Sequence, residues 1–371
     1  MKRLTALALV FGFSLICRAD DPEIPTLALG AKAPDFRLKG VDDKEYALKD
    51  FDRSKYLAIV FTCNHCPTAQ AYEARLKALV DDYKDKSLAV VAISPNDENS
   101  VRLDELGYTD LGDSFEDMKI RAAHAKFNFP YLHEGDKTGI SRKYGPTATP
   151  QVFLFDSERK LRYVGRIDDS EREANVAKKD LREALDALIA GTEVKTPKTN
   201  AIGCSVKWAG KAEQVKQFMA KIAKEPVEVS SIDAEGLKAL RKNDSKKLLL
   251  VNFWATWCGP CVTEFPELVT INRMYRGRAF EMVTVAANFP DEDIEVLAFL
   301  KKQQASNKNF LFGDKKKYEL MEAFDKDWNA SLPYTLLIAP GGEVLYKVQG
   351  AIEPLILKRA IVKALGEDRF K

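Results

Sequence analysis

Two pairs of cysteines, each with two residues between them, are the side chains of this sequence best suited to chemistry. They are Cys63 and Cys66 in a Cys-Asn-His-Cys sequence, and Cys258 and Cys261 in a Cys-Gly-Pro-Cys sequence. Cysteines at this spacing meet within one turn of helix, so they can form and break a disulfide with little movement of the backbone. The spacing therefore predicts two sites of thiol–disulfide exchange.

Each pair lies where an apolar run gives way to a helical stretch. The runs are Tyr56 to Phe61 and Leu248 to Trp254, and continuous apolar runs of this length are typical of strands buried on both faces. The helical stretches that follow extend through Tyr83 and to about Tyr275. A thiol at the start of a helix lies near free backbone N–H groups and the positive end of the helix dipole, and both lower its pKa.

The position of each thiol within its pair predicts its role. We expect Cys63 and Cys258 to be exposed nucleophiles with a lowered pKa. Cys66 and Cys261 are then the thiols that resolve the mixed disulfide formed on attack. His65 is expected to stabilise the Cys63 thiolate by a positive charge or a hydrogen bond. The first pair would then be the stronger oxidant, because the second pair has a proline in the place of this histidine.

Two prolines stand in the same place relative to the two pairs. Thr149-Pro150 and Leu332-Pro333 each directly precede a strand that is expected to open a hairpin. A cis peptide bond before such a proline would bring the preceding backbone close to the cysteines, where an extended substrate segment could pair with it. These four residues are therefore candidates for substrate binding.

The rest of the sequence alternates strands with helices in two similar halves. The other expected elements are strands at 88–93, 151–155, 161–165, 280–286, 335–338 and 343–348, and closing helices at 173–190 and 353–365. Alternation that ends in a hairpin and a helix predicts an α/β fold, in which each half is a mixed sheet flanked by helices.

The same pattern predicts the limits of the domains. Residues 29–190 and 227–371 are expected to form the two domains, and residues 191–226 the linker between them. Within the linker, apolar residues from Val215 to Ile222 recur at helical spacing. We expect this amphipathic helix to pack on the second domain.

Composition and the first residues exclude several classes of protein. The chain has 371 residues with 57 basic and 55 acidic side chains, a balance that argues against a nucleic-acid binder with a basic surface. Its 6 cysteines are too few for a disulfide scaffold.

Residues 1–19 have the basic start, short apolar run and small-residue end of a secretory signal. We therefore expect an exported protein of the periplasm or cell envelope, in an oxidising compartment.

The second half resembles thiol–disulfide oxidoreductases of the TlpA/ResA type, which have a thioredoxin fold. The residues that carry this resemblance are FWATWCGPC at 253–261 and the EFP that begins at Glu264. The first half resembles the redoxin (AhpC/TSA-like) branch of the same superfamily, through APDFRL at 33–38, LKDF at 48–51 and CNHCP at 63–67. The resemblance implies two thioredoxin-like domains, each with a redox-active cysteine pair.

The resemblance also places Glu264 close to the second pair as a partly buried acid. A carboxylate there would have a pKa raised by desolvation and could take the proton of Cys261 during resolution. The first half has no acid in the equivalent place, since Glu73 is seven residues after Cys66.

Together these features predict an exported thiol–disulfide oxidoreductase with no cofactor and no metal. Its expected partners are oxidised protein thiols as substrates and a thiol electron donor, which could be membrane-bound, with no nucleic acid. Electrons would pass from the second cysteine pair to the first, or the two pairs would serve different partners.

Two other functions stay open, as does the role of one cysteine. A thiol peroxidase would suit the redoxin character of the first half, although the P-x-x-x-T-x-x-C peroxide pocket is absent. A metal carrier would hold zinc between the two pairs, or copper at Cys63, Cys66 and His133. Cys204 could resolve the first site, pair with another chain or stay a buried thiol.

Overall fold

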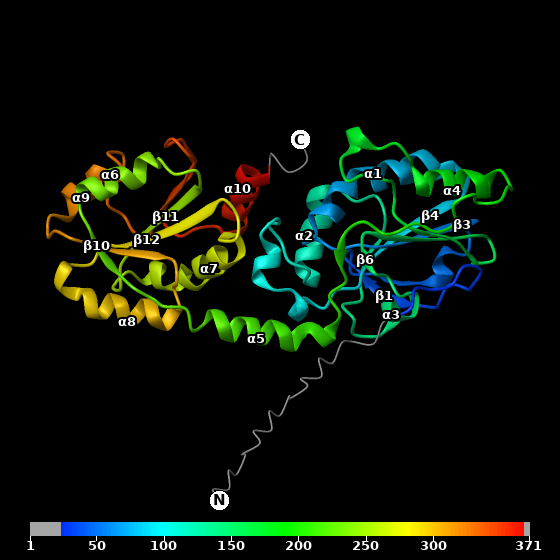
Figure 1. The fold of residues 1–371 in the computed structure, drawn as a ribbon, viewed down its shortest axis with the longest axis horizontal. Helices are drawn as coiled ribbons and strands as arrows, with labels where there is room; N and C mark the ends of the chain where they lie inside the picture. Colours follow the sequence, from blue (N-terminus) through cyan, green and yellow to red (C-terminus); the bar gives the residue numbers. More distant parts are fainter. Residues whose placement is uncertain (1–23, 367–371) are drawn as a thin grey trace, which may run out of the picture.

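The structure is a computed structural model that describes residues 24–366. The secretory signal expected at residues 1–19 lies outside the described residues. Two β-sheets are each flanked by helices, so the predicted α/β fold of two thioredoxin-like domains is confirmed (Figure 1). Among the described helices, none combines the length and the apolar character needed to cross a bilayer.

The first domain is built on a seven-stranded mixed sheet. Its strands, in spatial order, are β2 (Glu45–Ala47), β1 (Arg37–Gly40), β5 (Tyr131–His133), β4 (Leu88–Ser94), β3 (Tyr56–Phe61), β7 (Gln151–Phe155) and β8 (Leu161–Gly165). The central strand β3 pairs in parallel with β4 and antiparallel with β7, and every one of its residues is buried. This burial on both faces explains why the strand reads as an unbroken apolar run.

Helices cover both faces of this sheet. One face carries α1 (Pro67–Tyr83), α2 (Phe115–Ala125) and α4 (Asp180–Ile189), and the other carries α3 (Ile140–Tyr144). Because successive side chains of a strand point to opposite faces, β3 contributes to two cores. Tyr56 and Val60 pack into the first core, and Leu57 and Phe61 into the second.

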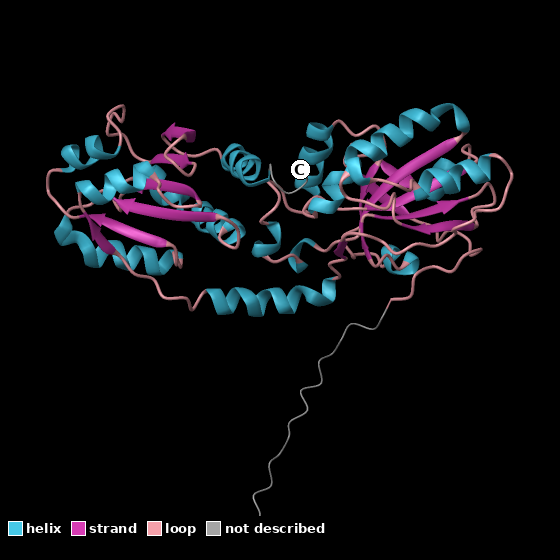
Figure 2. Ribbon diagram, turned by 45° about the horizontal axis from the view of Figure 1, so that its top comes forward, coloured by secondary structure: helices cyan, strands magenta, loops and turns pink. Residues whose placement is uncertain are grey.

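The second domain repeats this plan with six strands. Their spatial order is β10 (Ser230–Ile232), β13 (Lys308–Phe312), β12 (Phe280–Ala286), β11 (Leu248–Trp254), β14 (Tyr334–Ile338) and β15 (Val344–Gln349). One face carries α6 (Ala234–Lys242) and α9 (Lys317–Phe324), and the other carries α7 (Gly259–Tyr275), α8 (Asp293–Gln303) and α10 (Pro354–Gly366). Figure 2 shows both sheets between their layers of helix.

The segment expected to be a linker, residues 191–226, is in part held by the first domain. Lys198 forms a bridge to Val164 of β8. Further on, β9 (Cys204–Ser205) pairs antiparallel with β6 (Ala148–Thr149). These contacts are made by backbone groups, which explains why the side-chain pattern of the segment did not predict them.

The amphipathic helix of this segment, α5 (Ala212–Ile222), packs on the first domain and not on the second as expected. It lies against the turn η3 (Glu98–Ser100), and the Arg102 guanidinium lies 4.9 Å from the centroid of the Phe218 ring. Trp208, just before the helix, is buried, so the helix must start beside the first domain. Figure 1 shows α5 extending from there toward the second domain.

The two domains also contact each other directly. The Tyr275 hydroxyl, at the end of α7, donates to the Thr109 carbonyl of the first domain at 2.8 Å, and the tyrosine is buried. Arg359 of α10 donates to the Asp110 carboxylate at 2.9 Å. This contact lies at the end of α7 opposite to Cys258.

We expect Tyr275→Phe to lower the free energy of unfolding by about 1 kcal/mol, because the buried Thr109 carbonyl loses its donor. Urea unfolding of the full chain measures this change. Tyr318→Phe is the control, since Tyr318 is 78% exposed and its substitution should change stability by less than about 0.5 kcal/mol. Equal stabilities of the two variants would contradict the hydrogen bond.

Candidate functional site

The first cysteine pair lies between β3 and α1, as its sequence context predicted. Both thiols are reduced, and the exposed fractions are 3% for Cys63 and 0% for Cys66. Thr149 packs directly against the first thiol, with its Oγ1 at 3.1 Å from Cys63 Sγ. The expectation of an exposed Cys63 is therefore wrong, because a residue distant in sequence covers it.

The two pairs differ in where the helix begins. Cys66, the second cysteine of its pair, occupies the N-cap position of α1 without a capping hydrogen bond from its side chain. In the second domain the capping residue of α7 is Cys258, the first of its pair. The helix start that lowers the pKa of a thiol therefore acts on opposite members of the two pairs.

The proton affinities of the first pair follow from this difference. Burial, a hydrogen bond to Cys66 and the charge of Asp113 raise the pKa of Cys63 well above its ordinary value. The neighbouring Cys204 and Cys63 thiols lower the pKa of Cys66 in spite of its burial. The expectation of a low pKa at Cys63 is therefore wrong, and the lowered pKa of this pair belongs to Cys66.

The strand before Pro150 lies against both thiols. The Thr149–Pro150 peptide bond is cis, and the Thr149 carbonyl accepts a hydrogen bond from Cys66 Sγ at 3.2 Å. Thr149 also stands opposite Cys204 in the pairing of β6 with β9. The structure thus brings Thr149 and Pro150 to the cysteine pair, and their role in substrate binding stays a prediction.

His65 pairs with an acid that the sequence did not reveal. Its Nδ1 lies 2.6 Å from Asp113 Oδ2, and both side chains are fully buried. The same carboxylate accepts the backbone N–H groups of Asn64 and His65 and the Nδ2 of Asn96. Asp113 therefore fixes the two residues between the cysteines outside the helix. His65 is neither exposed nor hydrogen-bonded to Cys63, so the expected stabilisation of the Cys63 thiolate by that bond is wrong.

His65 and Asp113 shift the pKa of each other in opposite directions. Burial alone would lower the pKa of His65, but the charge of Asp113 and their hydrogen bond raise it above the ordinary 6.5. Burial alone would raise the pKa of Asp113, but the charge and hydrogen bonds of His65 bring it below the ordinary 3.8. Each of the two side chains thus favours the charged form of the other.

The possible metal ligands of the first site are Cys63, His65 and Asp113, whose ligand atoms lie within 4.8 Å of one another. Two of the three, the imidazole and the carboxylate, are already bonded to each other. The alternative copper set of Cys63, Cys66 and His133 is not formed, because within the described residues His133 does not join the two thiols at this distance. The alternative zinc site between the two pairs is not formed either, since the pairs lie in separate domains and the second is a disulfide.

The second cysteine pair lies between β11 and the start of α7. Cys258 and Cys261 form a disulfide with an S–S distance of 2.03 Å. Cys258 Sγ accepts the backbone N–H of Cys261 at 3.3 Å. Cys258 is 6% exposed, contrary to expectation, whereas the neighbouring Trp257 is 62% exposed.

Glu264 is buried on α7, one turn after Cys261. Its carboxylate accepts the Asn252 Nδ2 at 3.1 Å and the Ile352 backbone N–H at 2.8 Å. Burial raises the pKa of Glu264 in spite of these two hydrogen bonds. A carboxyl with a raised pKa therefore lies beside the second pair, and its part in resolution stays a prediction.

An apolar groove adjoins the second pair. Its cavity of about 510 Å³ is lined by Trp257, Phe289 and Leu332, among others. Leu332 precedes Pro333 through a cis peptide bond. Lys317 lies at the groove with its Nζ 3.5 Å from the centroid of the Phe289 ring. The groove thus combines aromatic surface with a cation.

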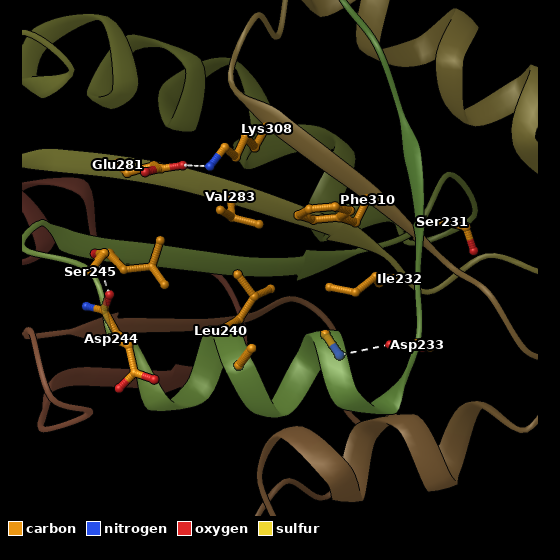
Figure 3. A pocket seen from close by; sticks show the side chains of 14 residues that line it. Ser231, Ile232, Asp233, Leu240, Asp244, Ser245, Glu281, Val283, Lys308 and Phe310 are labelled. Atoms are coloured by element: carbon orange, nitrogen blue, oxygen red, sulfur yellow. Dashed lines mark hydrogen bonds and ion pairs between the residues drawn. The ribbon is translucent and has the colours of Figure 1, made fainter.

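Another cavity of the second domain lies between α6 and the sheet (Figure 3). It measures about 530 Å³ and is lined by Ile232, Leu240 and Phe310, with the Glu281–Lys308 ion pair at the sheet. Its lining contains neither a cysteine nor a residue next to one or to Pro333, whereas the groove above contains Trp257 and Leu332. We therefore assign it no part in thiol chemistry.

We expect Asp113→Asn to lower the pKa of His65, because the buried imidazolium loses its counter-charge. In the wild-type chain this imidazole should stay protonated above pH 6.5, and in the variant it should titrate below that value. NMR titration can follow it, since the chain has only 3 histidines. His133, whose pKa burial lowers, is the internal control.

The same substitution should change how stability depends on pH. The pKa of His65 is raised by folding, so its contribution is complete below pH 6.5 and is lost as the pH rises through the folded-state pKa. The pKa of Asp113 is lowered, so its contribution is present above pH 3.8 and is lost as the pH falls. Asp113→Asn should therefore destabilise the chain more at pH 5 than at pH 8. An equal loss at both values would contradict the ion pair.

Two protein-family models match the sequence. The AhpC/TSA family matches residues 29–164, and the Redoxin family matches residues 211–364. Each match contains one of the two cysteine pairs.

Relatives of known name share part of the chain. It is 32% identical over 116 residues to "Thiol-disulfide oxidoreductase ResA" of Bacillus subtilis. The aligned residues are 31% of this chain and 60% of that protein. It is 28% identical over 135 residues to the ResA of Bacillus thuringiensis subsp. konkukian, which covers 36% of this chain and 73% of that protein.

Two solved structures resemble about half of the chain. A hypothetical protein from Sinorhizobium meliloti 1021 is 32% identical with a TM-score of 0.44, over 50% of this chain and 97% of that one. An uncharacterized conserved protein from Geobacillus kaustophilus is 34% identical with a TM-score of 0.43, over 49% of this chain and 92% of that one.

The two family matches fall on the seven-stranded and the six-stranded sheet, and each of these sheets has its cysteine pair after a central strand, β3 or β11. This chain is a tandem thioredoxin-fold protein made of two redoxin-family domains.

Proposed function

We propose that this chain is a thiol–disulfide oxidoreductase that reduces disulfides of other proteins. The observation that carries the proposal is the geometry of the second pair. Cys258 caps α7, its sulfur accepts the Cys261 N–H, and it adjoins a groove with the exposed Trp257. A sulfur in this position is stabilised as a thiolate once the disulfide is reduced. The relatives named ResA support the same class of reaction.

The reduced second pair would act in two steps. The Cys258 thiolate attacks one sulfur of the substrate disulfide, so that a Cys258–substrate bond forms and the substrate S–S bond breaks. The released substrate thiolate takes a proton from water. Cys261 then attacks Cys258 Sγ, which releases the second substrate thiol and restores the Cys258–Cys261 disulfide. Two electrons pass from the dithiol to the substrate.

Glu264 is the proposed acceptor of the Cys261 proton in the second step. It lies on the same face of α7 one turn away, and burial raises the pKa of its carboxyl, which makes it a better proton acceptor than a surface glutamate. Once ionised, it keeps two hydrogen-bond donors, Asn252 and Ile352 N–H.

The first pair is proposed to be the more oxidising of the two, so that electrons pass from the second pair to the first. The hydrogen bonds around Cys66 stabilise its thiolate, and stabilising the reduced form raises the reduction potential. In the sequence analysis the higher potential of the first pair was attributed to His65, and it is attributed here to the surroundings of Cys66. The 17 residues of α7, about 25 Å of helix, separate Cys258 from the interdomain contact at Tyr275. Transfer therefore requires a movement of the domains or a carrier thiol.

The proposed partners are oxidised protein thiols, which would bind in the groove of Trp257 and Leu332, and a thiol electron donor. The Lys317 cation beside this groove favours acidic segments.

Export is proposed from the signal pattern of residues 1–19. Fractionation of cells that express the chain with and without these residues tests it.

We expect Cys258→Ser to slow the reduction of insulin disulfides at least about 100-fold, because the nucleophile is lost. Cys63→Ser should retain most of this activity if the second site acts on proteins directly.

Equilibration of each pair with glutathione buffers should give a less negative reduction potential for Cys63–Cys66 than for Cys258–Cys261. An equal or more negative potential would reverse the proposed electron flow, and preferential turnover of hydrogen peroxide by the first site would favour a peroxidase.

We expect Glu264→Gln to slow resolution by about 100-fold, because the amide cannot accept the Cys261 proton. In the wild-type chain the rate should fall as the pH drops through the raised pKa of Glu264, and the variant should lack this part of the profile. Stopped-flow Trp fluorescence of the reduced chain with a disulfide substrate measures the rate. Glu322→Gln, at an exposed position of α9, is the matched control. An unchanged pH profile in Glu264→Gln would rule out this role.

A further inference from the structure

The strand β9 places a third thiol at the first site. It pairs antiparallel with β6, so that Cys204 stands opposite Thr149. Cys204 packs against the buried cluster of Cys63, Cys66 and Ala69, and its presence lowers the pKa of Cys66. The first site therefore contains three sulfurs, two from the Cys-x-x-Cys motif and one from the segment after the domain.

The segment that carries Cys204 is fixed to the domain. The Lys207 N–H donates to Asn96 Oδ1 at 2.9 Å, and the Lys207 carbonyl accepts the Asp97 N–H at 2.9 Å. On the other side of Cys204, Gly203 approaches so closely that a Cβ there would lie 2.0 Å from the Thr149 carbonyl oxygen. The position of the third sulfur is thus set by contacts on both sides of it.

Cys204 is the most accessible of the three thiols. It is half-buried, whereas Cys63 and Cys66 are almost completely buried. In addition, β9 occupies the backbone edge of Thr149 at which an external extended peptide would pair. A partner from solution must therefore reach Cys204 first, and a small molecule can do so without displacing β9.

We propose that Cys204 is a third redox thiol of the first site, which exchanges with low-molecular-weight disulfides and then forms a disulfide with Cys66. The proposal rests on the thiol–disulfide exchange proposed above, and extends it to a cysteine outside the Cys-x-x-Cys motif.

The proposed thiol–disulfide exchange has three steps. The Cys204 thiolate attacks one sulfur of R–S–S–R, so that Cys204–S–S–R forms and one RSH is released after protonation. The Cys66 thiolate then attacks Cys204 Sγ, which forms Cys66–Cys204 and releases the second RSH. Two electrons and the two thiol protons pass from the protein to R–S–S–R. Cys63 can finally attack Cys66, which moves the disulfide to Cys63–Cys66 and returns the proton to Cys204 with no net change in electrons.

Peptide mapping of the full chain distinguishes these disulfides. Trypsin cleavage puts Cys63 and Cys66 on residues 56–75, and Cys204 on residues 199–207. A Cys66–Cys204 bond therefore joins two peptides, whereas Cys63–Cys66 stays within one. After reduction and exposure to glutathione disulfide, Cys63→Ser should give the joined peptides as the main product, and Cys66→Ser should give markedly less of them.

A second measurement uses a chain with the Cys-x-x-Cys motif intact. The first site should be oxidised by glutathione disulfide about tenfold more slowly in Cys204→Ser than in the wild-type chain, because the accessible thiol is lost. Ser205→Ala, at the exposed neighbour on β9, is the matched control and should keep the wild-type rate. Acid quenching and alkylation, followed by mass spectrometry, give these rates.

The second domain supplies the internal control. Its pair lies on the tryptic peptide 248–273, and oxidation of that peptide shows that the reagent acts and the second domain is folded. Cys204 that stays free or only glutathionylated in Cys63→Ser, with 248–273 oxidised and an unchanged circular dichroism spectrum, would overturn the third-thiol proposal. So would an equal oxidation rate in Cys204→Ser. Failure of insulin reduction by the wild-type chain, with the joined peptides formed, would instead count against the proposed function.

Discussion

Burial of one strand on both faces determines where the chemistry of each domain takes place. Every residue of β3 and of β11 is buried between the two layers of helix. Each strand therefore ends where this cover ends, at the edge of its sheet. In both domains the chain turns into a helix, whose first N–H groups have no partner within the helix. The capping cysteine, Cys66 or Cys258, lies beside these groups.

The two sites differ because the helix starts at opposite ends of the two motifs. In the first domain, Asp113 accepts the N–H groups of Asn64 and His65, so these residues stay in a loop and α1 begins after Cys66. In the second domain the equivalent residues belong to α7. The hydrogen bonds to Asp113 and the proline at the first position of α1 are thus consistent with a helix that begins after Cys66.

The surroundings of the two pairs differ as well. Thr149 contacts Cys63 and Cys66, and β9 lies along its backbone with Cys204, so this site is closed by the chain itself. The second pair adjoins a groove with an exposed Trp257, and the buried Glu264 follows it one turn along α7. A closed site suits exchange with small molecules, and an open groove suits exchange with protein segments.

The sequence by itself determined the strand limits of β3, β7, β8, β11 and β12, and the position of each cysteine pair, because apolar periodicity and Cys-x-x-Cys spacing are local properties. Only the tertiary structure decided which sulfur is stabilised, since that depends on Asp113 and Cys204. Both are distant in sequence, and neither has a local pattern that links it to Cys66. It also decided that α5 packs on the first domain, because amphipathic spacing defines a face to be buried but not its partner.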